Sequence, residues 1–253
     1  IIGVKDFKGF LFTPTFYVVA FLCAVIMSWM YPNHLSQFIA NGQNQMFQMQ
    51  AGMPQQMMNI HYAVFVRHLS LLNLILIFLV PALTMRMIAE EKKLRTYDLL
   101  LTSPVTSVQI VVGKYLAVIG AIFALMSVAL LYPVFTRMFV EFQWGLLFVA
   151  LLGIFLLAAV YAAMDLFCSA LTESALVAYV MAVIMNISVW FVGVGAEVAD
   201  GSLSRQIFEH ISLNTHLSAL IEGAIRTNGL IFLASVIVLF VFLTERVVES
   251  SRW

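Results

Sequence analysis

Six apolar stretches, each close to the length that a helix needs to cross a bilayer, determine what this 253-residue chain can fold into. A spanning helix needs about 20 apolar residues, and in lipid the backbone must satisfy its own hydrogen bonds. The composition agrees, because 62% of the residues are hydrophobic and only 10% are charged, against about 25% in soluble domains. We therefore predict an all-α polytopic membrane protein that forms a single transmembrane domain over residues 1–253.

The polar residues between the apolar stretches set the expected spans. These cover residues 10–30, 63–88, 108–131, 144–169, 175–195 and 229–243. We expect the first span to end at Pro32-Asn33. The segment before it mixes lysines with aromatic residues, which indicates an N-terminal interfacial helix or, alternatively, a flank whose lysines snorkel. Apolar residues at helical spacing between the fifth and sixth spans predict two short amphipathic helices on the outer face.

The distribution of basic residues orients these spans. Both termini lie on the same side when the number of spans is even, and that side holds nine of the 13 Lys and Arg residues. The nine are Lys5, Lys8, Arg86, Lys92, Lys93, Arg95, Lys114, Arg246 and Arg252. Because basic residues collect in cytoplasmic loops, we expect both termini to be cytoplasmic.

The loop between the second and third spans carries the densest cluster of charges in the chain. Two glutamates precede Lys93 and Arg95 at the spacing of paired charges on a helix, and leucines around Tyr97 supply an apolar face. Pro104 would stop that helix. The pattern predicts a short amphipathic helix, and the alternative is a solvated loop that only marks topology. Since a topology signal needs only Lys and Arg, the glutamates and leucines favour a binding role.

The same loop resembles a motif of type-two ABC exporter permeases. The matching residues are Glu90-Glu91, Arg95-Thr96, Leu100-Leu101-Thr102 and Pro104, continued by Gly113-Lys114-Tyr115-Leu116. Thr13-Pro14-Thr15-Phe16-Tyr17-Val18-Val19 and Ser169-Ala170-Leu171-Thr172-Glu173-Ser174 resemble two further parts of the family pattern. Within the family, the chain most resembles the gliding-motility-associated (GldF-like) and NosY-like permeases. It departs at Arg95, where glycine is more frequent, and at Ala175, where a polar residue is common.

This resemblance implies a non-catalytic membrane subunit of an ATP-driven exporter in a bacterial inner membrane. Two permease subunits, identical or different, would each sit on a separate ATPase subunit, which would bind the ATP and Mg. The charged loop would be a coupling helix in a groove of the ATPase, and the turn between spans four and five would be a second contact. The ATPase-coupling residues would be Glu90, Glu91, Lys93, Arg95, Thr96, Leu99, Leu100, Thr102, Pro104, Thr172 and Glu173. An accessory subunit with a periplasmic domain often accompanies such permeases.

Catalytic motifs are absent from the sequence. Gly113-Lys114 lacks the first glycine of a P-loop, because Val108 stands in its place. The sequence has no HExxH motif and no clustered carboxylates, and Cys23 and Cys168 lie inside apolar stretches. We therefore expect no catalytic or metal-binding residue, no cofactor in this chain and no nucleic-acid partner.

Polar residues inside the spans are the remaining candidates. Asp165, Asn73 and Asn186 could line a path or a seam between two permeases. Asp165 could instead snorkel to cytoplasmic water, and the asparagines could form interhelical hydrogen bonds. The methionines that follow the first span, Met46, Met49, Met53, Met57 and Met58, offer thioethers to Cu(I) or an adaptable apolar contact surface.

Other function classes remain open at this point. An ion-coupled transporter would be expected to show internal repeats and broken helices, which the spans offer little of. A membrane scaffold without transport would not need the elaborate charged loop. The exporter could also act mechanically, by signalling the state of the ATPase to a periplasmic partner. The sequence does not identify a substrate.

Overall fold

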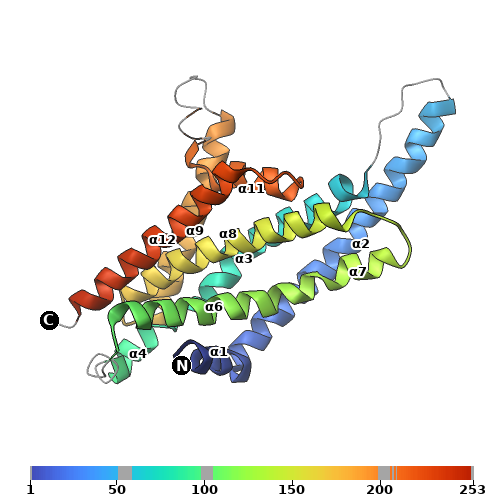
Figure 1. Cartoon of the computed structure of the whole chain (residues 1–253). Coiled ribbons are helices and arrows are strands. Elements are labelled where there is room, and N and C mark those ends of the chain that lie inside the picture. Colours follow the sequence, from blue (N-terminus) through green and yellow to red (C-terminus); the bar gives the residue numbers. More distant parts are fainter. Residues whose placement is uncertain are drawn as a thin grey trace.

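The computed structural model describes residues 2–50, 59–97, 105–198, 206, 208 and 210–251, with the backbone alone at residues 2, 43–50 and 196–198. Regular structure within these ranges is entirely helical (Figure 1). Six of the helices are long and apolar enough to cross a membrane. The prediction of an all-α, multi-pass membrane protein is confirmed.

The helices follow one another along the chain with short connections. In chain order they are α1 (Ile2–Phe12), α2 (Pro14–Gln50), a π-helical turn (His61–Phe65), α3 (Val66–Thr84), α4 (Ala89–Lys93), α6 (Ser107–Ala129), α7 (Leu131–Arg137), α8 (Trp144–Ala170), α9 (Ala175–Val198), α11 (Leu213–Ile221) and α12 (Thr227–Ser250). Helices α1 and α4 lie at one end of the bundle and α11 at the other (Figure 1). We call these the α4 end and the α11 end.

Helix α8 is the centre of the bundle. It packs against α3, α6, α9, α11 and α12, and 67% of its most apolar 18-residue stretch is buried. Small residues such as Ala158 and Ala162, both fully buried, let neighbouring backbones approach closely in the absence of a hydrophobic driving force within lipid. Only 17% of the corresponding stretch is buried in each of α9 and α12, so these two helices present most of their surface outward.

The N-terminal segment forms a separate helix, so the expected start of the first span at residue 10 is wrong. Helix α1 ends at Phe12, and the hydroxyl of Thr13 donates a hydrogen bond to the Gly9 carbonyl over 2.6 Å. Pro14 then occupies the first turn of α2, where its fixed φ and missing N–H are tolerated. Helix α1 lies along α6 (Figure 1), and its interfacial position stays a prediction.

The expected end of the first span at Pro32-Asn33 is also wrong, because α2 continues through Pro32 to Gln50. The Asn33 amide donates to the Trp29 carbonyl over 3.2 Å, which supports the backbone beside the proline. Tyr31 is buried, with its ring centroid 4.9 Å from that of His68. This side-chain packing outweighs the hydrogen bond that a proline removes.

The other elements extend the expected spans at their ends. Helix α7 continues beyond the third span, and α12 runs to Ser250 rather than stopping at residue 243. Of the two short helices expected between the fifth and sixth spans, α11 is the second. Its N-cap, Ser212, accepts a hydrogen bond from the Thr215 N–H. The first falls in a segment where residues 199–205, 207 and 209 lie outside the described part of the chain.

Candidate functional site

A four-residue turn separates α3 from α4, and one serine hydroxyl holds it. The Oγ of Ser169, near the end of α8, accepts hydrogen bonds from the N–H groups of Ile88 and Ala89, both at 3.2 Å. The same hydroxyl donates to the Met85 carbonyl over 3.1 Å. N–H groups at the start of a helix lack partners within it, and Ile88 and Ala89 are fully buried. Ser169 therefore fixes the entry into α4.

Lys114 on α6 is the second anchor of this region, and only 1% of its surface is exposed. Its Nζ lies 2.8 Å from the Met87 carbonyl oxygen, 2.7 Å from Oε1 of Glu91 and 3.6 Å from Oδ2 of Asp6. A buried ammonium group is stable only when it is paired and hydrogen-bonded. We call this group the Lys114 junction, and it joins α1, α4 and α6.

Lys92 ties α4 to the turn that follows α8. Its Nζ donates to the Ala170 carbonyl over 2.6 Å, at a helix C-terminus that favours a positive charge. The ammonium also lies 5.3 Å from the centroid of the Tyr97 ring. Tyr97 belongs to a small buried cluster with residues of α6, α8 and α12, among them Val111, Leu166 and Val248. The segment around α4 therefore packs on α6, α8 and α12 through a small apolar cluster of its own.

The side chains left in contact with solvent form what we call the α4-tip surface. It consists of Lys93, Leu94, Arg95, Thr96, Leu171, Thr172 and Glu173. Leu94 is 64% exposed and Leu171 is 47% exposed, so apolar groups stand among charges of both signs. Glu90 lies beside it and pairs with Arg86 over 4.0 Å. Such a mixture suits a protein-binding surface better than a lipid-facing one.

The structure changes the expected pattern of charge pairs. Helix α4 ends at Lys93, and Glu91 pairs with Lys114 rather than with Arg95 four residues later. The prediction of paired charges along one loop helix is therefore wrong for Glu91. The remaining predicted coupling residues, Leu99, Leu100, Thr102 and Pro104, lie outside the described residues. Sequence reasoning gave no role in the site to Lys92, Lys114, Ser169 or Asp6, although Lys114 and Ser169 stand in the quoted motifs. The available signal was a lone lysine inside the third apolar stretch.

Arg95 has a φ of 57°, which is the left-handed region that glycine adopts readily and other residues avoid. The chain therefore needs, just after α4, the backbone geometry for which the resembling permeases more often carry glycine.

We expect Arg95→Gly to raise the free energy of unfolding by about 0.5–1 kcal/mol. Glycine adopts the left-handed conformation without strain, and this gain exceeds the entropy cost of the more flexible unfolded chain. Unfolding in mixed micelles would measure the change. The matched control is Lys93→Gly at the last residue of α4, which should lower stability by up to about 1 kcal/mol. Equal losses in both variants would contradict the assignment.

The three polar residues predicted inside the spans are buried within one chain. Asn73 accepts a hydrogen bond from the Tyr161 hydroxyl over 3.2 Å and donates to Asn214 over 3.5 Å. Asn186 donates to the Ile77 carbonyl over 3.4 Å. The interhelical bonds expected of both asparagines are therefore present. Asp165 is 1% exposed and does not reach water. A role of these residues in a path or a dimer seam stays a prediction.

The histidines near the α11 end belong to no cluster of metal-ligand side chains in the described chain. No group of three or more His, Cys, Asp or Glu side chains within those ranges could hold an ion. The rings of His34 and His68 lie 6.0 Å apart. Met53, Met57 and Met58 lie outside the described residues, and only the backbone is described at Met46 and Met49. Copper binding by that segment stays a prediction.

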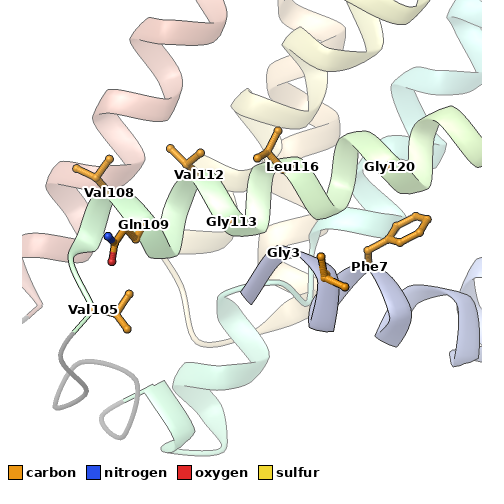
Figure 2. A pocket seen from close by; sticks show the side chains of 10 residues that line it. Gly3, Phe7, Val105, Val108, Gln109, Val112, Gly113, Leu116 and Gly120 are labelled. Carbon is orange, nitrogen blue, oxygen red and sulfur yellow. The ribbon is translucent and has the colours of Figure 1, made fainter. Parts of the chain in front are cut away.

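An apolar groove of about 790 Å³ runs between α1 and α6 beside the Lys114 junction (Figure 2). Val108, Val112 and Leu116 line it along α6. At its floor the two helices nearly touch, because a Cβ on Gly3 would lie 2.7 Å from the carbonyl oxygen of Gly113. Gly113 of the sequence motif thus lies where α1 crosses α6.

Comparison with known proteins identifies the family to which this chain belongs. The chain matches the family model of the ABC-2 family transporter proteins over residues 30–244. No curated protein matches it. The matched region begins in α2 and includes α3, α4, Lys114 with its partner Glu91, α8 and most of α12, while Asp6 and α1 precede it. Because the match covers well over half of the sequence, the chain belongs to the ABC-2 family and is a membrane permease subunit of an ABC transporter.

Proposed function

We propose that this permease is one of two membrane subunits of an ATP-driven exporter in a bacterial inner membrane. Each subunit would dock a separate ATPase, which binds the ATP and Mg, through the α4-tip surface. The excess of Lys and Arg at the α4 end supports a cytoplasmic position for that end and for both termini. The second permease subunit would be a copy of this chain or a related one.

The observation that carries the proposal is the joining of two separate loops into one surface. Ser169 binds the turn before α4, and Lys92 binds the end of α8. The loop after α3 and the turn after α8 therefore cannot move independently. A force applied to the α4-tip surface would reach the ends of α3, α6 and α8 together, which is what conversion of ATPase closure into helix motion requires.

The residues of the α4-tip surface take different parts in this docking. Glu90, Lys93, Arg95 and Glu173 would give charge complementarity to the ATPase. Leu94 would enter an apolar pocket, as would Leu99 and Leu100 of the same loop, while Thr96, Thr102, Pro104 and Thr172 would shape the contact. Glu91 would act indirectly, since its carboxylate is engaged with Lys114 and holds α4 in position.

Co-purification from native membranes, followed by reconstitution with the captured ATPase, tests this proposal. We expect Leu94→Ala combined with Lys93→Glu to weaken ATPase binding at least tenfold and to abolish stimulation of ATP hydrolysis, because interface anchors contribute about 2 kcal/mol or more. Arg137→Glu, an exposed charge reversal in α7, is the matched control and should change neither. Binding and stimulation that survive the α4-tip change would overturn the docking assignment. Capture of no ATPase would favour an ion-coupled transporter or a scaffold.

A mechanical role, in which the permease signals to a periplasmic partner, is favoured by the length of α2. Its 37 residues make a helix of about 55 Å, while the hydrocarbon core is about 30 Å thick. The helix is braced where it leaves the bundle, since Arg67 donates to Gln37 over 3.2 Å and Tyr31 bonds Thr136. We propose that this projection receives the accessory subunit known from gliding-type and NosY-like permeases.

A further inference from the structure

Asp165 is a buried carboxyl group for which the docking mechanism gives no role. It lies on α8 one helical turn before Ser169, and only 1% of it is exposed. Neither of its carboxyl oxygens has a hydrogen-bond partner. No lysine or arginine of the described chain forms an ion pair with it.

The polar groups that face Asp165 come from two other helices. Thr84 at the end of α3 and Asn186 on α9 lie within hydrogen-bonding range of the Asp165 carboxyl group, but both donors are directed to backbone carbonyls instead. The Thr84 hydroxyl is within donating distance of the carbonyls of Val80 and Pro81, at 3.1 and 3.2 Å. The Asn186 amide nitrogen is directed to Ile77, and its Oδ1 is buried without a partner. The titratable neighbours on α8 itself are Tyr161 and Cys168.

Three buried oxygen atoms at this site therefore lack a donor in hydrogen-bond geometry, two on Asp165 and one on Asn186. An ionised carboxylate there would be an unpaired charge inside the membrane, which costs several kcal/mol. A protonated carboxyl group carries no charge and supplies one O–H donor. A single proton thus removes the charge and gives the Asn186 oxygen its missing partner.

We propose that Asp165 is a proton-binding site, and that its neutral carboxyl donates a hydrogen bond to Oδ1 of Asn186. This bond fastens α9 to α8. Helix α9 is mostly exposed. Among the described residues, nearby polar contacts that attach it are the bond from Asn186 to Ile77 and a 3.6 Å contact between the sulfurs of Cys168 and Met185. Loss of the proton would place a charge beside α9 and loosen it, one turn from the serine that holds α4.

Infrared spectroscopy of the full-length protein in lipid nanodiscs near neutral pH tests the protonation directly. The sequence contains four aspartates, so labelling their side chains with ¹³C isolates a small set of bands. We expect the labelled wild-type protein to show the C=O stretch of a protonated carboxyl. This band should be missing from Asp165→Asn and present in Asp6→Asn. Carboxylate bands alone in the labelled wild-type protein would overturn the proposal, whether or not any variant folds.

The proposed acceptor, Oδ1 of Asn186, is tested by Asn186→Leu, which replaces the amide with an apolar side chain of similar shape. If Asp165 donates to that oxygen, its C=O band should shift to higher frequency in this variant. A band at unchanged frequency would overturn the pairing of α8 with α9. These measurements need no ATPase, so they are independent of the proposed docking function.

Discussion

Glu91→Ala is expected to lower the free energy of unfolding by about 3 kcal/mol, the lower end of the range for breaking a buried ion pair. The reason is the position of its partner, because the side chain of Lys114 is 2% exposed and cannot reach water. Asp6, 3.6 Å from the same ammonium, would compensate in part. Unfolding in mixed micelles, followed by circular dichroism, would measure the loss.

A double-mutant cycle distinguishes this pairing from simple loss of packing. Lys114→Met should cost less than Glu91→Ala, since the side chains of Glu91 and Asp6 are 28% and 18% exposed and their carboxylates can turn toward water. Combining Lys114→Met with Glu91→Ala should cost less than the sum of the two single changes. A larger loss for Lys114→Met, or strict additivity, would show that the Lys114 junction does not hold α4.

Ser169→Ala is expected to cost about 2 kcal/mol, because it leaves the buried N–H groups of Ile88 and Ala89 without an acceptor. The larger effect should be functional. Once the turn before α4 is released, Lys92 forms the remaining hydrogen bond between the two loops of the α4-tip surface among the described residues. ATPase subunits should then still bind, while the stimulation of hydrolysis should fall severalfold.

The matched control is Ser188→Ala on α9, because within the described part of the chain that hydroxyl bonds the Ile184 carbonyl of its own helix and no other group. It should change neither stability nor stimulation by a measurable amount. Thermal unfolding and ATPase rates of the two alanine variants, measured in the same lipid, make the comparison. Equal behaviour of Ser169→Ala and Ser188→Ala would contradict the role given to Ser169.

The spans with uninterrupted apolar sequence could be predicted closely. The fourth was expected over residues 144–169 and α8 covers Trp144–Ala170, while the fifth began at the predicted residue, Ala175. Hydropathy works here because every polar group in lipid must be satisfied inside the helix. The prediction failed at Pro32, where local propensity indicated an end. The rings of His68 and Tyr132 pack on Tyr31 and stabilise α2 beyond Pro32. These contacts come from distant segments, so nothing local in the sequence reveals them.

The candidate site was predicted as a region but not as a mechanism. The charge cluster and its motif located the loop at residues 85–104. The pairing of Glu91 with Arg95 that the spacing of charges along one helix predicts was wrong. The partner actually chosen lies 23 positions away in the sequence, on another helix. Pairing across such a separation depends on which helices become neighbours.

The sequence by itself determined that this protein lies in a membrane, how many spans it has and which loop carries its charges. These properties follow from composition and from the length of the apolar stretches. Only the tertiary structure decided which of those charges are buried and which remain on the α4-tip surface. The physical reason is that a charge on Lys114 is tolerable inside the protein only with Glu91 and Asp6 beside it. That proximity arises from the packing of α1 and α4 against α6, which no segment of the sequence specifies alone.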